Sequence, residues 1–249
     1  EKNNLVGGAY AEPFAGGAGL ALNLLFSGFV SKIYINDLDR SIYAFWHTVL
    51  NEPERLITTM QNTPITVEEH EKQFAVQLNK ANASLFDLGF STFFLNRTNV
   101  SGVLRGGIIG GKKQTGKYKI DARFNKVALA DKIRKIAELK PWIHLSNDEA
   151  STFLVRMEEE LSKDSLVFLD PPYYVKGVSL YYNHFSNADH AILANNVKKY
   201  TKHWIVSYDN VKEVCQLYKP YRHKTYSLNY SVKEHYQGSE VMFFSKGLI

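Results

Sequence analysis

The 249-residue chain is 45% hydrophobic, carries a net charge of +5 and contains one cysteine, Cys215. This length can bury the core of one large domain, or of one domain with an insertion. No apolar run approaches the roughly 20 residues of a membrane helix, and a lone cysteine excludes an internal disulfide framework and a cysteine-rich zinc site. The histidines show no metal-ligand spacing, so we expect no metal, and we expect a reducing, cytoplasmic location.

The first predicted unit is a strand at 9–12, a glycine-rich turn at 13–19 and a helix that ends near Gly28. Such a unit lets a ligand approach the backbone at a helix N-terminus. Its spacing differs from the Gly-x-Gly-x-x-Gly of dinucleotide sites, and the absence of a following Lys-Ser/Thr argues against a P-loop.

The second predicted strand, 32–35, ends in Asn36-Asp37. An acid at the tip of the second strand, about 20 residues after a glycine turn, is placed to accept hydrogen bonds from ribose hydroxyls. The alternative is that Asp37 caps the helix predicted at 41–50. The turn and the acid together favour a ligand that contains adenosine.

Residues 51–96 are polar and helical in pattern, and residues 97–126 are basic and rich in glycine. The basic stretch holds eight lysines and arginines against one acid, Asp121, a net charge of +7. This concentration is the electrostatic footprint of a phosphate-backbone partner, and a solvated basic loop is the alternative. So many glycines predict a mobile hairpin or loop, with a possible strand at 117–120. Asn99, Arg105 and Gln114 have the chemistry to read base edges in a DNA groove.

Alternation of helices and strands resumes after residue 126. Helices are predicted at 127–139, 151–161, 188–200 and 211–218, and strands at 142–145, 166–169, 204–206, 226–228 and 241–244, with a polar loop at 229–239. The expected fold is a doubly wound α/β domain formed by 1–50 and 126–249, with a helical, basic insertion at 51–125.

The strand at 166–169 is followed by Asp170-Pro171-Pro172-Tyr173. Neither proline has a backbone N–H and both fix φ near −65°, so this turn is stiff. In open α/β sheets, ligands bind at the carboxyl ends of the strands. The alternative is an ordinary strand-ending turn.

An exocyclic amino group on a nucleobase suits this turn. The nitrogen lone pair is delocalised into the ring, and acceptors aimed at its two N–H bonds favour a pyramidal, nucleophilic nitrogen. Asp170 and the carbonyl of Pro171 can supply those acceptors, and Tyr173 can stack on a base that has left the duplex. Held in line with a methyl sulfonium, the nitrogen attacks directly. Methylation at cytosine C5 would need a cysteine nucleophile at a Pro-Cys turn, and Cys215 lies in a predicted helix instead.

The ordered motifs resemble the DNA adenine N-methyltransferases of the Dam type, the alpha arrangement of amino-methyltransferases, over nearly the whole chain. They are Glu12-Pro13-Phe14-Ala15-Gly16, Asn36-Asp37, Phe94-Leu95-Asn96-Arg97, Asp170-Pro171-Pro172-Tyr173 and Ser239-Glu240-Val241.

The resemblance implies a Rossmann-like methyltransferase sheet, S-adenosylmethionine as cofactor, and double-stranded DNA as substrate. It implies that Glu12, Pro13, Phe14 and Gly16 lie near the methionine part of the cofactor, with Asp37 on the ribose. Asp170 is implied to lie between the sulfonium and the target amino group, in a catalytic set with Pro171, Pro172 and Tyr173. The insertion is implied to recognise the target; the expected DNA contacts are Arg97, Asn99, Arg105, Lys112, Lys113, Lys117 and Lys119.

Two departures from the family pattern are visible. Ala18 takes the last glycine place of Phe-x-Gly-x-Gly, and because Gly17 and Gly19 flank it we expect a preserved turn. The chain as given also starts after the family's Gly-Gly-Lys segment, so we expect this fragment to bind cofactor weakly or not to turn over.

Several alternatives remain open at this point. They are a cytosine amino-methyltransferase, a methyltransferase that acts on RNA or on protein glutamine, a catalytically defective DNA-binding relic of the same fold, and a nucleotide-binding oxidoreductase. If the protein is an adenine methyltransferase, a separate restriction endonuclease is a possible partner.

Overall fold

Seven strands form one sheet in the computed structural model, which describes residues 1–174, 185–230 and 236–249. They are β1 (Ala9–Glu12), β2 (Lys32–Asn36), β3 (Ile143–Ser146), β4 (Leu166–Leu169), β5 (His203–Asp209), β6 (Arg222–Tyr230) and β7 (Tyr236–Phe244). Their order is β3-β2-β1-β4-β5-β7-β6; β7 is antiparallel to both neighbours and the other pairs are parallel. The predicted doubly wound α/β sheet is confirmed, and its order reverses between β1 and β4, where ligands bind in such folds.

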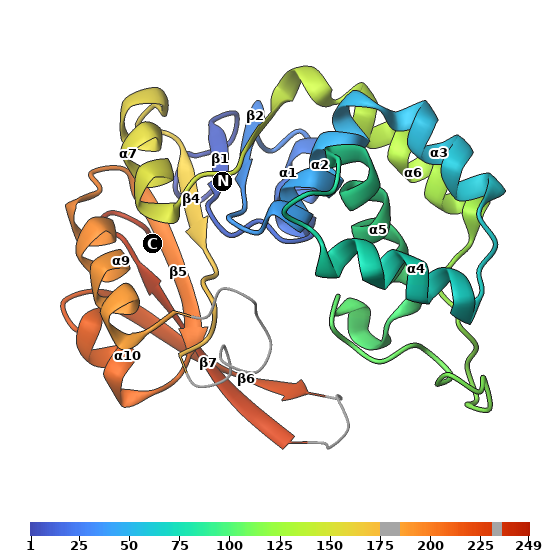
Figure 1. Ribbon diagram of the computed structural model, residues 1–249. Helices are drawn as coiled ribbons and strands as arrows, with labels where there is room; N and C mark the ends of the chain where they lie inside the picture. Colours follow the sequence, from blue (N-terminus) through green and yellow to red (C-terminus); the bar gives the residue numbers. More distant parts are fainter. Residues whose placement is uncertain (175–184, 231–235) are drawn as a thin grey trace. The chain divides into compact units, whose positions relative to one another are not determined.

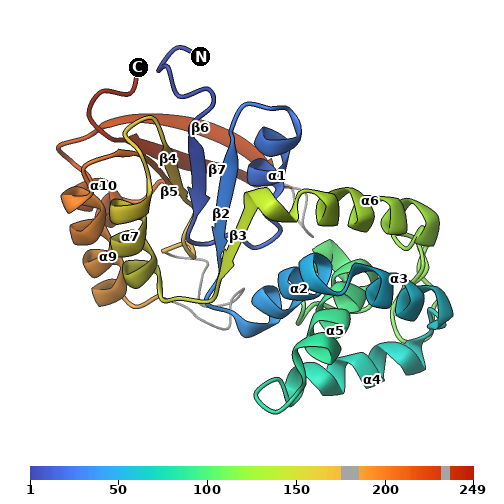
Figure 2. The same ribbon diagram turned by 90° about the horizontal axis from the view of Figure 1, so that it is seen from above.

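Helices cover both faces of this sheet. Helices α7 (Ala150–Glu160), α9 (Asn187–Lys199) and α10 (Lys212–Leu217) lie along one face, as Figures 1 and 2 show. Their apolar side chains share one core with Val167 and Leu169 of β4 and with Trp204 and Val206 of β5. Helix α1 (Gly19–Phe26) packs on β1 and β2. Val167 and Leu169 of β4 are fully buried in this core, and Leu166 and Phe168, which point to the other face, are partly buried, so the strand reads as a continuous apolar run.

The antiparallel hairpin of β6 and β7 is longer than the sequence predicted. The polar stretch 229–239 was expected to be a loop, but the strands reach Tyr230 and start again at Tyr236. Main-chain pairing from Arg222↔Phe244 to Tyr230↔Tyr236 extends the hairpin beyond its apolar part. Hydrophobic periodicity does not reveal such an extension, because the stabilising hydrogen bonds are those of the backbone.

The chain divides into two compact units, residues 1–39 with 142–249, and residues 40–141. The second unit contains α2 (Arg40–Asn51), α3 (Pro53–Asn62), α4 (Val67–Leu78), α5 (Leu85–Thr98) and α6 (Lys126–Glu138), with a 3₁₀ turn, η1 (Val100–Gly102). Another 3₁₀ turn, η2 (Lys140–Trp142), leads towards β3. The segment between η1 and α6 is a loop, and residues 117–120, predicted as a possible strand, form turns and bends there.

Helix α5 is the centre of the helical unit. Its Gly89 allows close packing on α2, because a Cβ at this position would lie 2.5 Å from the carbonyl oxygen of Ala44 and 2.3 Å from Oγ1 of Thr48. Helices α2 and α6 pack within this unit, on α5 and α3 respectively. The helical unit of the structure, 40–141, is therefore longer at both ends than the predicted insertion at 51–125.

None of the helices in the described part of the chain has the length and apolar character needed to cross a membrane.

Candidate active site

The glycine-rich turn after β1 is tied directly to the acid after β2. The backbone N–H of Gly16 donates to Oδ2 of Asp37 at 3.0 Å, and the N–H of Asp39 donates to Oδ1 of the same carboxylate at 2.9 Å. Asp37 therefore orders both the glycine turn and the turn that follows β2.

The glycine-rich turn after β1 contains Ala18 at the place where the motif Phe-x-Gly-x-Gly has its last glycine. Ala18 adopts φ 45° and ψ 34°, the left-handed region, at the N-cap of α1. Its N–H donates to the carbonyl of Ala15 at 2.6 Å, and its own carbonyl accepts from the N–H of Leu22 at 3.0 Å. An L-residue in this region costs about 1–2 kcal/mol relative to a right-handed conformation, and the surrounding turn holds Ala18 there. The glycine-rich turn therefore forms with Ala18 in the left-handed conformation.

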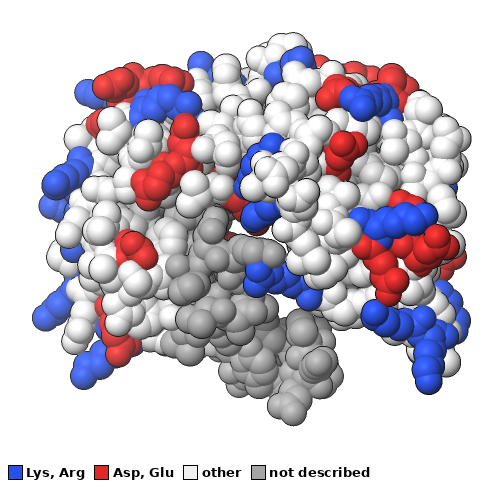
Figure 3. All heavy atoms as spheres, in the orientation of Figure 1, with Lys and Arg blue, Asp and Glu red and all other residues white. Residues whose placement is uncertain are grey.

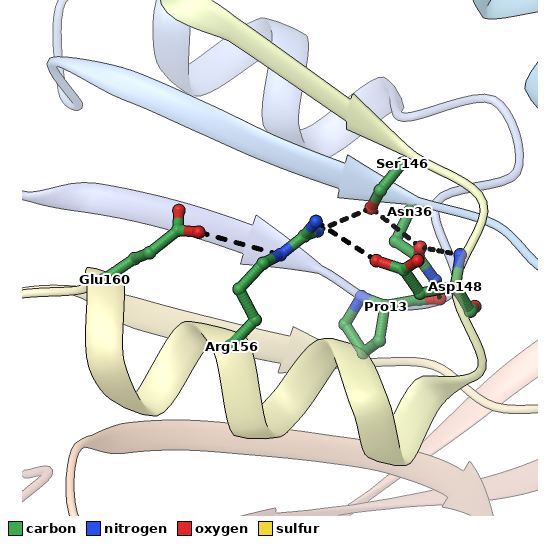
Figure 4. Close-up of polar contacts among 6 residues, drawn as sticks. All are labelled: Pro13, Asn36, Ser146, Asp148, Arg156 and Glu160. Atoms are coloured by element: carbon green, nitrogen blue, oxygen red, sulfur yellow. Dashed lines mark hydrogen bonds and ion pairs between the residues drawn. The ribbon is translucent and has the colours of Figure 1, made fainter.

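Asn36 fixes the turn against β3, as Figure 4 shows. Its buried side chain donates to the carbonyls of Pro13 (3.0 Å) and Asp148 (2.9 Å), and its Oδ1 accepts from the Ser146 hydroxyl and the Asp148 N–H, both at 2.8 Å. Arg156 of α7 in turn donates to Ser146 (2.8 Å) and pairs with Asp148 (3.1 Å). A buried amide with every bond made specifies one arrangement of the groups around it. The sequence indicated Asn36 only through its place beside Asp37.

A cavity of about 300 Å³ lies at the carboxyl ends of β1, β2 and β4. It brings together predicted residues of three separate segments: Pro13, Phe14 and Gly16 of the glycine turn, Asp37, and Asp170 with Pro172. Ala15 of the same predicted motif also lines it; sequence reasoning missed the other walls, which are Gly17, Leu38, Asp39, Glu149, Ala150 and Phe185. Phe185 packs edge-on against Phe14, with ring centroids 5.7 Å apart. For Glu149 a signal was available, since it follows the third strand much as Asp37 follows the second.

Glu12, which was predicted to bind the cofactor, is not among the residues that line this cavity. It is the last residue of β1, is only 6% exposed, and accepts a hydrogen bond of 2.8 Å from the hydroxyl of Tyr10. Burial raises the pKa of its carboxyl to about 7, and the charge of Asp170 acts in the same direction. The hydrogen bond from Tyr10 opposes that shift. Glu12 is therefore a buried acid that is electrostatically linked to Asp170.

The turn after β4 is held at both of its tyrosines. The hydroxyl of Tyr173 donates to Oε1 of Glu240 at 2.9 Å, and the N–H of Tyr174 donates to Oδ1 of Asp209 at 2.9 Å. Asp170 opens into the cavity, yet the protein around its carboxyl keeps enough water away to raise its pKa to about 6; the negative charge of Glu240 adds to this effect. Of these partners, the sequence had singled out only the Ser239-Glu240-Val241 motif, without assigning Glu240 a role.

In the helical unit, Asn99 serves an internal purpose. It is fully buried; its Oδ1 lies 2.6 Å from Nε2 of His70, and its Nδ2 donates to the carbonyls of Val103 (2.9 Å) and Leu104 (3.0 Å). The side chain is committed to closing the loop after α5. Gln114 is used in a similar way, with its amide bonded to the backbone of Ile109, Gly111 and Ile120.

The predicted cations of this unit differ in their surroundings. Arg97 is half-buried, and both Nε and Nη2 donate to Oδ1 of Asn96, at 3.1 and 2.5 Å; burial and the neighbouring Arg123 lower its pKa. Lys112 pairs with Glu71 of α4 at 2.9 Å. The remaining predicted cations, Arg105, Lys113, Lys117 and Lys119, are exposed. Figure 3 shows basic side chains along the edge of the helical unit where this loop runs in Figure 1.

The same loop and η1 line a second cavity, of about 530 Å³, which is open to the surface. Its wall combines exposed apolar groups, Val100 and Tyr118, with the cations Lys117 and Arg123. The other lining residues are Ser101, Ile109, Gly110, Gly116 and Ala122.

Two solved methyltransferase structures are similar to this chain. One is a candidate RNA methyltransferase from Pyrococcus horikoshii, 9% identical, with a TM-score of 0.43 and coverage of 97% of this chain and 76% of the other. The second is an S-adenosylmethionine-dependent methyltransferase from Agrobacterium tumefaciens, 8% identical, with a TM-score of 0.41 and coverage of 95% and 55%. Both TM-scores are below 0.5, so these likenesses do not bear on the family.

A search of curated protein sequences gave no match. The sequence model for the D12 class of N6 adenine-specific DNA methyltransferases matches residues 2–233, nearly the whole chain. The cavity that joins the glycine turn, Asp37 and the Asp-Pro-Pro-Tyr turn lies within this match. The chain therefore belongs to the D12 class of N6 adenine-specific DNA methyltransferases, a class that uses S-adenosylmethionine as methyl donor.

Proposed function

We propose that the cavity beside Asp170 is the catalytic site, with the methyl donor against the glycine turn and the target adenine against the Asp-Pro-Pro-Tyr turn. The observation that carries this proposal is the shared wall: Gly16, Asp37 and Asp170 line one space although they come from three segments. A single space of this kind is what direct transfer between two bound molecules requires.

The chemistry of the cavity wall fits S-adenosylmethionine. Asp37, Asp39, Glu149 and Asp170 bring four carboxylates to it, and no lysine or arginine is present among the described residues that line it. Carboxylates suit a ligand that carries ammonium and sulfonium charges and ribose hydroxyls. The same wall would repel the phosphates of a dinucleotide, which argues against the oxidoreductase alternative.

Asp37, Gly16 and Phe14 are the residues proposed to hold this ligand. A carboxylate oxygen can accept more than one hydrogen bond, so the Asp37 oxygens that accept from Gly16 and Asp39 can also accept from the ribose hydroxyls. Gly16 has φ 47°, and a Cβ there would meet nothing within 4 Å, so the turn presents open backbone towards the cavity. The bound donor supplies an electrophilic methyl group.

Asp170 and the carbonyl of Pro171 are proposed to accept the two N–H bonds of the adenine amino group. These acceptors favour a pyramidal nitrogen whose lone pair points at the methyl carbon. The carboxyl pKa of about 6 leaves Asp170 mainly ionised, and so able to accept, at neutral pH. Tyr173 is proposed to stack its ring on the flipped base, because its hydroxyl is already bound to Glu240.

The helical unit is proposed to recognise the target DNA. Support comes from the exposed cations Arg105, Lys113, Lys117 and Lys119, which suit phosphate contacts. The cavity rimmed by Val100 and Tyr118 offers apolar surface beside these cations for the edge of a base. Asn99 and Arg97 are proposed to stabilise the loop from within, because their side chains form hydrogen bonds inside the helical unit.

Tritium transfer from labelled S-adenosylmethionine to duplex DNA by the full-length protein tests the catalytic proposal. We expect incorporation that is lost in Asp170→Ala and retained in Glu213→Gln, an exposed acid on α10. Equal incorporation by Asp170→Ala would overturn the assignment. Mass spectrometry of the digested DNA should find N6-methyladenine and no N4-methylcytosine.

A catalytically defective relic would behave differently in one measurement. It would retain DNA binding but give no heat when S-adenosylmethionine or its demethylated product is titrated into the protein. Sequencing of modified bases in cells that express the protein would identify the DNA site. We propose that the modification protects this site from a separate restriction endonuclease in the cytoplasm. Cleavage of unmodified DNA that carries the site by an extract of the same cells, without cleavage of the modified DNA, would support this role.

A further inference from the structure

Glu240 is a buried carboxylate with two tyrosine partners. It lies on β7, is 5% exposed, and accepts from the hydroxyl of Tyr173 (2.9 Å) at Oε1 and from that of Tyr226 (2.8 Å) at Oε2. An isolated buried carboxylate is strongly unfavourable unless hydrogen bonds compensate for its lost hydration. The two tyrosines provide that compensation, and in return the position of the Tyr173 ring edge is fixed.

The strand register explains why Glu240 reaches the turn after β4. Asp209 of β5 and Tyr226 of β6 are the direct cross-strand partners of Glu240, so the three side chains share one face of the sheet. Asp209 accepts from the N–H of Tyr174, the residue after Tyr173. The cross-strand partners Asp209 and Glu240 thus bind two consecutive residues of the turn, Tyr174 and Tyr173. Pro171 and Pro172 stiffen the part between β4 and Tyr173.

We propose that Glu240 is a positioning residue for methyl transfer, which orients Tyr173 through the hydroxyl bond and places a negative charge beside the turn that carries Asp170. This inference rests on the proposed function of Asp170 and Tyr173. The hydroxyl bond leaves the face of the Tyr173 ring as the surface offered to the base. A more basic Asp170 forms stronger hydrogen bonds to the amino group.

The electrostatic part has a defined environment. Among the described residues, those that interact with the Asp170 carboxylate include Glu240 of β7, Glu12 and Tyr10 of β1, Tyr208 of β5 and Tyr226 of β6. These five side chains are acids or phenols. Burial is the first cause of the raised pKa of Asp170, and Glu240 is the second. Removal of the Glu240 charge should therefore lower the pKa of Asp170 without returning it to that of an exposed aspartate.

Three variants separate the two effects. Glu240→Gln removes the charge. Tyr173→Phe keeps the ring and the charge but removes the hydroxyl bond to Glu240. Tyr226→Phe removes the hydroxyl that bonds to the other carboxylate oxygen of Glu240 and also contacts Ser207. The measurements are kcat, the KM for DNA and the dependence of kcat/KM on pH, with Glu213→Gln as the matched control.

We expect Glu240→Gln to lower kcat by about 10–100-fold, as for misplaced catalytic groups, with a much smaller change in KM. The acid limb of the pH profile of kcat/KM, where activity falls as Asp170 becomes protonated, should lie at a lower pH in Glu240→Gln than in the wild type. Tyr173→Phe should lower kcat while leaving that limb in place, and Tyr226→Phe should have the smallest effect. The double variant Glu240→Gln/Tyr173→Phe should lose less than the product of the single losses, because both substitutions alter the same Tyr173–Glu240 hydrogen bond.

A wild-type kcat and an unshifted acid limb in Glu240→Gln would overturn the proposal. If circular dichroism shows that Glu240→Gln is unfolded, Tyr173→Phe becomes the test of the positioning role. A kcat of Tyr173→Phe equal to that of the wild type would then reject that role. Retained activity in Asp170→Ala would instead reject the proposed function itself, so the two failures are distinguishable.

Discussion

Gly16 and Asp37 lie 21 positions apart in the chain and are joined by a 3.0 Å hydrogen bond from a backbone N–H to a carboxylate oxygen. The bond couples the shape of the glycine turn to the acid that is proposed to hold the ribose. A change at Asp37 should therefore act on the cofactor site twice, through the lost acceptor and through the loosened turn.

Asp37→Ala should weaken the binding of S-adenosylmethionine at least tenfold, because a hydrogen bond to a charged group contributes about 1.5–3 kcal/mol. Asp37→Asn should weaken it less, since the amide oxygen can still accept from Gly16. Isothermal titration calorimetry measures both, with Glu213→Gln as a folded control. An unchanged dissociation constant in Asp37→Ala would remove Asp37 from the site.

Glu12→Gln should stabilise the protein at high pH. The carboxyl pKa of Glu12 is raised from 4.5 to about 7 in the folded state. A raised pKa means that the folded state prefers the protonated acid, so wild-type stability is lost as the pH rises from about 4.5 through 7. Glutamine has no such loss and can still accept from Tyr10.

The free energy of unfolding, measured with urea, should thus favour Glu12→Gln by about 1–3 kcal/mol at pH 8, given about 1.4 kcal/mol for each pKa unit. The advantage should disappear near pH 4.5. The same difference at both pH values would contradict the assigned shift and indicate a packing effect instead.

Lys113→Ala and Lys117→Ala should each weaken DNA binding by a similar factor on all DNA sequences. Both side chains are exposed on the loop after α5, and each phosphate contact contributes about −0.9 to the slope of log K against log salt. Fluorescence anisotropy at several salt concentrations should show a slope that is smaller by about one per lysine. Lys198→Ala, an exposed lysine of α9, is the control; an equal loss in this variant would show that the loop has no special role.

Asn99→Ala should loosen the loop after α5 without changing which DNA sequence is methylated. The buried amide holds the carbonyls of Val103 and Leu104, and an unpaired buried acceptor costs about 1–3 kcal/mol. Limited proteolysis should cut the loop faster than in the wild type, and the melting temperature should fall. Altered specificity with an intact, protease-resistant loop would instead support a base contact by Asn99.

Much of the fold and the cofactor side of the site follows from local sequence. The apolar run 166–169 predicts a buried strand, and Pro171 and Pro172 end it by local steric rules alone. Because parallel strands end at the same edge, the acids after β2 and β4 could be assigned to one site without knowledge of any contact. Local patterns also identified the helical, basic part, although not its limits, since the packing of α2 and α6 on its helices is a long-range property.

The tertiary structure decided which polar groups line the cavity beside Asp170 and which form hydrogen bonds inside the protein. Asn99 and Gln114 look like base readers in the sequence but close their own loop. Glu240 becomes a partner of Tyr173 only because antiparallel β7 lies between β5 and β6. The physical reason is that residue type and spacing set what a side chain can bond to, whereas strand register and burial determine the partner that it meets.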